Sequence, residues 1–368
     1  MSVTLNGTSG LVFGDGTIQG TAGAMAFRNR IINGDMRIDQ RNAGAAVTHS
    51  SGFTYYLDRW YFAPSQNAKM SIQQVDAPSG FDQFTKAAKL TTVSAFTPGA
   101  TDYFGWDQAI EGYNIADLMW GTASAKTVSL SFWVQSSLTG TFGGSILAPS
   151  GGTNYPFTYT INAANTPEYK TVTIPGPTSG TFGKTNGVGC YVIFDMGSGS
   201  SQRGTAGSWQ AGNFVGATGT VNVVSTNAAT WFISGVQFEK AAAATSFEHR
   251  PYGTELAMCM RYFVSLPVEQ RDTRQYSQND IAILVNIPCV MRDAPSVQLA
   301  SALTSGNTIL FSSPNAAWYT FSSNTSIGIA PSGISSYRIS LGFTGGSTQA
   351  VYPHFGTSIL KFNLSSEL

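Results

Sequence analysis

The chain has little charge, few cysteines and no long apolar run. Asp, Glu, Lys and Arg make up 11% of its 368 residues, against roughly 25% in an ordinary soluble domain. The formal net charge is zero and basic residues never cluster, so the patch that a nucleic-acid partner requires is missing. No stretch of about 18 apolar residues occurs, and the first residues lack the pattern of a secretory signal peptide. We therefore expect no nucleic-acid binding, no membrane insertion and no classical secretion.

The cysteines and histidines are too scattered to predict a disulfide framework or a metal site. Cys190, Cys259 and Cys289 form no Cys-x-x-Cys pair. Histidines occur only at positions 49, 249 and 354, and no His-Glu-x-x-His pattern is present. We expect buried free thiols, no metal and no cofactor.

The chain is instead rich in glycine, aromatic residues and short alternating runs. It contains 40 glycines and 12% aromatic residues. In TVSLSFWV (127–134) apolar and other side chains alternate with the period of a β-strand. CYVIFDM (190–196) is largely apolar on both faces, as a central strand is, and TWFISGVQFEK (230–240) is typical of a strand bulged at Gly235. Turn-rich segments separate these runs, which predicts an all-β fold of two β-sandwich or jelly-roll domains.

The pattern divides the chain into three parts. Residues 1–27 form a short lead, 28–263 a larger jelly-roll-like sandwich, and 264–368 a smaller β-sandwich. Few helices are expected: one over 115–121 and one over 254–263, the latter with an acidic residue in its first turn. In the third part, apolar side chains alternate in IAILVNIP (281–288), SYRISLGF (336–343) and SILKFNL (358–364).

The lead contains a hairpin-like element. Leu11 and Phe13 lie on one arm, Ile18 lies on the other, and Asp15-Gly16 is a tight-turn signal. An isolated hairpin is marginal in water, whereas copies from several chains could bury these side chains together about a symmetry axis. We therefore expect a docking or oligomerisation role, and the alternative is a disordered leader that contains a turn.

Three stretches resemble a recurrent module of tailed-bacteriophage structural proteins. They are NRIINGDMRIDQRNAG with YYLDRWYF (29–44, 55–62), QAIEGYNIADLMWGTASAKTVSLSFWVQSSLTGTFGGS with YPFTYTINAANTPEYKTVTIPG (108–145, 155–176), and WFISGVQFEKAAAATSFEHRPYGTELAMCMRYF (231–263). The lead resembles a short LxFxDGTxQxTA element that often precedes such modules. The resemblance implies a sandwich similar to carbohydrate-binding modules, displayed on the virion as an oligomer, often a trimer. It implies no catalytic residues, so none is assigned.

The resulting interpretation is a non-enzymatic virion protein, a tail fibre or appendage subunit that displays its sandwiches for host-surface glycan recognition. Its expected partners are its own copies as a homotrimer, other virion proteins through residues 1–27, and host-surface polysaccharide. It is expected to be assembled in the host cytoplasm and exposed on the particle. One alternative is a capsid-borne head fibre or decoration protein. Another is a polysaccharide-degrading enzyme with Asp107 and Glu111 as acid and base.

Glycan recognition on a β-sandwich requires flat aromatic faces beside amides and carboxylates. We select candidates that the pattern places in loops or on outward strand faces: Trp106, Asp107, Glu111, Trp133, Tyr155, Trp209, Trp318 and Tyr319. Core packing is the competing role for each aromatic residue. Trp60 and Trp231, inside strand patterns, are expected in the core.

Overall fold

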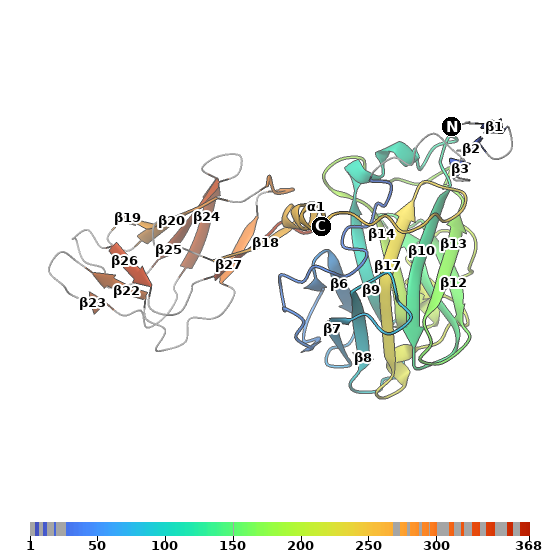
Figure 1. The fold of residues 1–368 in the computed structure, drawn as a ribbon. Coiled ribbons are helices and arrows are strands. Elements are labelled where there is room, and N and C mark those ends of the chain that lie inside the picture. Colours follow the sequence, from blue (N-terminus) through green and yellow to red (C-terminus); the bar gives the residue numbers. More distant parts are fainter. Residues whose placement is uncertain are drawn as a thin grey trace.

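The computed structural model describes residues 27–149 and 151–266 in full. Elsewhere it gives the backbone of strands near both ends of the chain and, with side chains, residues 289–293, 295–296 and 363–368. The fold is all-β, as the sequence predicts (Figure 1).

Two six-stranded antiparallel sheets pack face to face in the central part of the chain. The front sheet has the order β12 (Asn154–Ile161), β11 (Gly140–Leu147), β14 (Val188–Ser198), β9 (Tyr103–Glu111), β6 (Trp60–Pro64) and β5 (Thr54–Leu57). The back sheet has the order β13 (Glu168–Ile174), β10 (Val128–Ser136), β17 (Thr230–Glu239), β8 (Lys86–Thr92), β7 (Met70–Asp76) and β4 (Val47–Thr48). Because neighbouring strands are often distant in sequence, each outer face combines side chains from far apart in the chain.

The core lies between the two sheets and is rich in aromatic rings. Leu130 and Phe132 on β10 point into it, as their alternation predicts, and Phe194 reaches it from β14. Trp60 and Trp231 are fully buried there, which confirms their predicted role. Burying a large side chain stabilises the fold by about 1.5–3 kcal/mol, so this cluster is the main source of the sandwich's stability.

The predicted bulge in β17 is confirmed. Gly235 has a φ of 63°, a left-handed conformation that suits glycine. The register of β10 against β17 shifts opposite it, between Ser131 and Trp133. A Cβ at Gly235 would lie 2.3 Å from the Phe84 ring, so the bulge also lets that ring pack directly on the backbone.

One predicted helix is confirmed and the other is wrong. The helix expected over 254–263 is α1 (Tyr252–Met260). The segment 115–121 instead contains one 3₁₀ turn, Ala116–Leu118, which follows another at Gly112–Asn114 and is ended by Met119 in the left-handed region. Residue Ile115 between them has a φ of −124°, so no continuous α-helix forms, and such short segments have little helical stability of their own.

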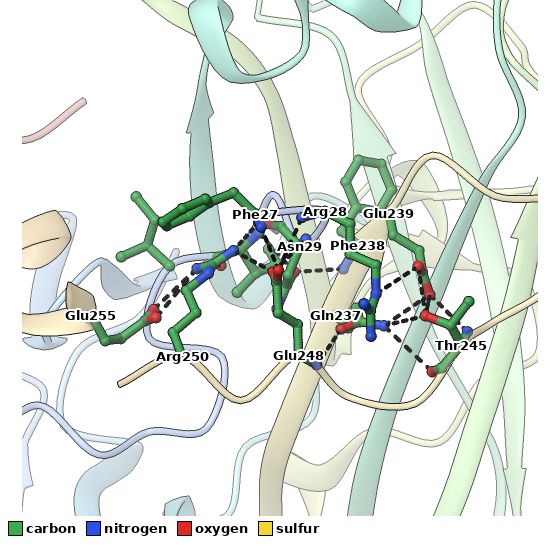
Figure 2. A network of polar contacts seen from close by, with 12 residues as sticks. Phe27, Arg28, Asn29, Gln237, Phe238, Glu239, Thr245, Glu248, Arg250 and Glu255 are labelled. Atoms are coloured by element: carbon green, nitrogen blue, oxygen red, sulfur yellow. Dashed lines mark hydrogen bonds and ion pairs between the residues drawn. The ribbon is translucent and has the colours of Figure 1, made fainter. Parts of the chain in front are cut away.

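Residues 27–38 have no repeating structure, yet polar side chains fix them to the sandwich (Figure 2). The carboxylate of Glu248 accepts hydrogen bonds from the backbone amides of Phe27, Arg28 and Asn29, those of Arg28 and Asn29 at 3.2 and 3.0 Å. The Asn29 side chain accepts from the Phe238 amide on β17 at 3.0 Å. These two side chains therefore supply hydrogen-bond acceptors to backbone amides that have no partner in a neighbouring strand, as buried amides require.

The next residues approach β17 so closely that their identity is constrained. A Cβ at Gly34 would lie 2.2 Å from the Val236 carbonyl oxygen. Asn33 adopts a left-handed φ of 57°, and its side chain bonds to the backbone of Ile38 and Asp58. Asparagine tolerates this conformation better than most residues. Residues 27–38 therefore form a continuous contact with β17 and with residues 248–255, and this contact is called the seam below.

The lead forms a small antiparallel sheet of β1 (Thr4–Asn6), β2 (Gly10–Val12) and β3 (Ile18–Gln19). Leu11 pairs with Gln19, and Val12 pairs with Ile18, so the two predicted arms lie side by side. Phe13 and the Asp15-Gly16 turn lie outside the described residues. The docking role of the lead stays a prediction.

The C-terminal strands are also antiparallel. They form three groups, each in spatial order: β18 (Phe263–Pro267), β27 (Lys361–Ser365) and β21 (Ser296–Leu299); β19 (Thr273–Ser277), β20 (Asp280–Asn286), β25 (Ser336–Gly342) and β24 (Ser326–Pro331); and β23 (Trp318–Tyr319), β22 (Ile309–Ser312) and β26 (Tyr352–Phe355). Strands β20, β25 and β27 overlap the three predicted runs. The division of the chain near residue 264 stays a prediction.

The described residues also bear on the cysteines, on metals and on membranes. All three cysteines are free; Cys190 and Cys259 are buried, whereas Cys289 is only partly buried. Among the residues that the structure describes, no cluster of three or more His, Cys, Asp and Glu side chains could hold a metal ion. In the same part of the chain, every helix is too short or too polar to cross a membrane.

A tyrosine-lined groove on the front sheet

A groove with a volume of about 450 Å³ lies on the outer face of the front sheet. Strands β6, β9 and β14 supply its floor, and the β5–β6 hairpin supplies one wall. The β11–β12 turn and the loop that follows β14 contribute the other side. Five aromatic rings line it: Phe53, Tyr55, Tyr61, Tyr103 and Tyr191.

Strand alternation determines which side chains face the groove. On β6, Trp60 and Phe62 point into the core, so Tyr61 between them faces outward. On β9, Trp106 is buried in the core and Asp107 faces outward. Tyr61 pairs with Asp107 across β6 and β9, so a ring and a carboxyl lie side by side on the floor.

The aromatic rings form a contiguous surface at one end of the groove. The ring centroids of Tyr55 and Tyr61 lie 5.1 Å apart, and those of Phe53 and Tyr61 lie 6.4 Å apart. Phe53 is 70% exposed, so much of its ring is open to solvent beside this cluster. Burial raises the pKa values of Tyr55, Tyr61 and Tyr191 above their ordinary value, so their hydroxyls remain protonated at neutral pH.

Asp107 is the one carboxylic side chain among the described residues that line the groove. Its side chain is almost fully buried, and its Oδ1 atom has no hydrogen-bond partner among the described residues. A Cβ at Gly105 would lie 2.5 Å from that oxygen, so only a glycine at position 105 leaves the space that the carboxyl occupies. Burial, together with the negative charge of Asp195, raises the pKa of Asp107 well above its ordinary value.

The last described residues border the groove. The Tyr55 hydroxyl donates to the Leu368 carbonyl oxygen at 3.0 Å, and Leu368 lines the groove. Glu367 forms ion pairs with Arg41, at 2.7 Å, and with Arg59. Arg292 donates to the Glu367 carbonyl oxygen at 3.0 Å. The end of the described chain is therefore part of the site.

The structure corrects the predicted exposure of several aromatic candidates. Trp106 is fully buried and stacks on Trp60, with ring centroids 5.7 Å apart and an interplanar angle of 6°. It cannot present a face to a ligand. Tyr155 is also buried and packs against Trp209, and the Trp209 indole donates to the Pro175 carbonyl oxygen at 2.5 Å. Trp209 lies in a loop, as predicted, but this contact ties it to the sandwich.

Of the remaining aromatic candidates, only Trp133 has a described side chain, and it lies away from the groove. Trp133 is on the outer face of the back sheet, beside Phe81 and Tyr169. Trp318 and Tyr319 form β23, and their side chains lie outside the described residues. Their predicted glycan contacts stay untested.

The structure does not support Asp107 and Glu111 as a catalytic acid–base pair. The two residues are four positions apart on one strand, which separates their Cα atoms by about 13 Å. Glycosidase carboxyls lie about 5–9.5 Å apart. Glu111 is buried, forms an ion pair with Arg261 at 2.7 Å and accepts from the Tyr262 hydroxyl. These contacts link the end of β9 to the segment after α1, and they occupy both carboxylate oxygens of Glu111.

The sequence reasoning selected Asp107 but missed the five aromatic rings. A usable signal was present for Tyr61, because its neighbour Trp60 was correctly assigned to the core and the next residue of a strand faces the other way. Tyr191 gave a weaker signal, since the run CYVIFDM is largely apolar on both faces. Phe53 and Tyr103 lie at strand ends, where alternation gives little guidance.

Comparison with known proteins finds similar solved structures at low sequence identity. No family model matches the chain, and no curated protein matches it in sequence. The tailspike protein 4 enzymatically active domain of bacteriophage CBA120 is similar over 58% of this chain and 22% of its own length, with 13% identity and a TM-score of 0.32. The match therefore spans less than a quarter of that tailspike chain.

Two carbohydrate-binding modules are similar over nearly their whole length. A CBM4 module matches 57% of this chain and 98% of its own, with 16% identity and a TM-score of 0.30. A family 11 module from Clostridium thermocellum, solved with a β-1,3-1,4-mixed-linked tetrasaccharide, matches 54% and 97%, with 14% identity and a TM-score of 0.26. At these identities and TM-scores, the similarities carry no argument about what this chain binds.

Proposed function

We propose that this chain is a non-enzymatic, carbohydrate-binding structural protein that holds a sugar chain in the front-sheet groove. One observation carries the proposal: tyrosine rings surround a buried carboxyl whose Oδ1 has no partner among the described residues. Aromatic rings offer flat apolar faces with a polar tip, and sugars present apolar C–H faces bordered by hydroxyls. A buried polar atom without a partner is costly, so a ligand that supplies the missing hydrogen bond is favoured.

The groove also has the form expected of a binding site. It is concave, and its described lining combines five aromatic rings with polar groups, including Asp107, Gln202 and Asn213. Its volume of about 450 Å³ lies within the roughly 300–1,000 Å³ of typical ligand sites.

Replacing Tyr191 by Ala tests this assignment. We expect Tyr191→Ala to weaken binding of the best glycan from an array by about tenfold or more, because central aromatic anchors dominate such interfaces. The matched control is Tyr169→Ala, which removes a 45% exposed ring from the outer face of the back sheet. It should leave the affinity unchanged in calorimetric titration. Weaker binding by Tyr169→Ala together with unchanged binding by Tyr191→Ala would place the site on the back sheet instead. Shortened sugar chains in the same mixture would show that the protein is an enzyme.

We further propose that the chain belongs to a phage particle, as a tail fibre or appendage subunit, and that its lead attaches it there. The sequence resemblance and the three-stranded lead support this part of the proposal. Several copies on one particle would raise a weak affinity through effective concentration. A head fibre or decoration protein is the alternative placement, and labelling intact particles with an antibody would distinguish the two.

Deleting residues 1–26 tests the role of the lead. The deletion keeps Phe27 and its hydrogen bond to Glu248, so the sandwich should fold with an unchanged melting temperature. We expect the truncated chain to be monomeric in sedimentation and absent from purified particles. A truncated chain that still joins the particle and trimerises would contradict a docking role.

A further inference from the structure

The groove contains no basic side chain among the described residues that line it. Two arginines of the front-sheet region are engaged elsewhere. Arg59 pairs with Glu367, and Arg203 donates to the Ser198 hydroxyl at 3.0 Å. An anionic sugar, such as a uronate, a sialate or a phosphorylated residue, would find no cation to replace its lost hydration.

The groups around Asp107 oppose its ionisation. Tyr61 faces it from β6 and Ile193 from β14, by strand pairing. Tyr191 and Asp195, also on β14, share the same outer face, and the charge of Asp195 disfavours a second negative charge nearby. Asp195 has its own partners, since its Oδ2 accepts from Ser198 at 2.7 Å and lies 3.5 Å from Arg203. Burial and the neighbouring Asp195 therefore disfavour a charge on Asp107, and a carboxyl that keeps its proton can donate a hydrogen bond.

We propose, on the basis of the carbohydrate-binding function above, that the groove selects neutral glycans and that Asp107 recognises them by donating from its protonated carboxyl to a sugar oxygen. Tyr61 and Tyr191 flank this donor and offer uncharged ring surface. Glycans that carry carboxylates or phosphates are excluded because the groove supplies no counter-charge. Amine-bearing glycans are disfavoured because they would require Asp107 to ionise in a buried position.

The first arm of the test ranks glycan classes on the unmodified full chain. Matched oligosaccharides that are neutral, amine-bearing or uronate-bearing are compared on one array at neutral pH. We expect neutral glycans to bind at least about tenfold more tightly than either charged class. A uronate would find no cation among the described lining residues, and an amine would require the buried Asp107 carboxyl to ionise.

The second arm asks which form of the carboxyl is needed. Asp107→Asn keeps the shape and a donor but cannot carry a charge, so it should bind the neutral glycan within about threefold of the original chain. Asp107→Ala removes the donor and should bind about tenfold more weakly. Asp82→Asn, a change of the same chemistry outside the groove, should have no effect. Melting curves identify any variant that fails to fold.

The outcomes separate this inference from the function on which it rests. Strongest binding to uronate or amine glycans, or loss of binding in a folded Asp107→Asn variant, would overturn the selection for neutral glycans and leave carbohydrate binding intact. Binding to no glycan of any class would overturn the proposed function and this inference with it. The class ranking uses the unmodified chain, so it decides the question even if a variant does not fold.

Discussion

Replacing Arg250 by Met is expected to lower the free energy of unfolding by about 3–5 kcal/mol, the usual cost of removing one partner from a buried ion pair. Arg250 is buried, and it contacts Glu248 at 3.1 Å and Glu255 at 3.3 Å (Figure 2). It also donates to the carbonyl oxygens of Asn29 and Ile31. Methionine can occupy the space of the aliphatic stem, but it leaves two carboxylates and two carbonyl groups without this donor.

The matched control for this prediction is Arg30→Met. Arg30 pairs with Asp117 at 2.9 Å, but the Asp117 side chain is 45% exposed, and exposed pairs contribute at most about 1 kcal/mol. Urea denaturation at fixed pH should show a lower midpoint for Arg250→Met with an unchanged slope. Equal shifts for the two variants would contradict the role of the seam.

A double variant checks the cause. If the uncompensated charge of Glu255 is responsible, adding Glu255→Gln to Arg250→Met should recover part of the lost stability. Burial already raises the pKa of Glu255, and Arg250 opposes that shift. Without the arginine, the carboxyl should therefore hold its proton more strongly still.

Trp106→Ala is the second change with a large expected effect, about 3–5 kcal/mol of unfolding free energy. The ring is fully buried and stacks on Trp60, so its removal leaves a cavity beneath the groove floor. Trp133→Ala makes the same chemical change on the partly exposed outer face of the back sheet and should cost clearly less. Thermal and chemical denaturation of both variants measure the difference. A cost for Trp133→Ala as large as for Trp106→Ala would contradict these placements.

The contrast between these tryptophans shows where sequence reasoning succeeds. In TVSLSFWV the alternation is regular, so the inward face of β10 and the outward position of Trp133 follow from the pattern. In YFGWDQAIEG (103–112) Gly105 interrupts the apolar pattern, so the sequence predicts an exposed position for Trp106, which is wrong. The glycine is required there because the Asp107 carboxyl occupies the space of a side chain, a constraint that exists only in the folded state.

The groove itself could not be predicted from local patterns. Strands β6, β9 and β14 form its floor, and they are neighbours only because of the topology of the sheet. Tyr61 and Tyr191 are 130 positions apart in the sequence, so no local sequence pattern relates them. The predicted 115–121 helix failed for a similar reason, because tertiary contacts outweigh a weak local preference in such a short segment.

The contacts that residues 367 and 368 make with the sandwich also set an order of events during synthesis. Arg41, Arg59 and Tyr55 leave the ribosome more than three hundred positions before Glu367 and Leu368, to which they bind. Domains generally fold as units during translation, so the sandwich can form while these partners are still missing. The groove would then gain its contacts with residues 367 and 368 only after the strands of its floor have formed.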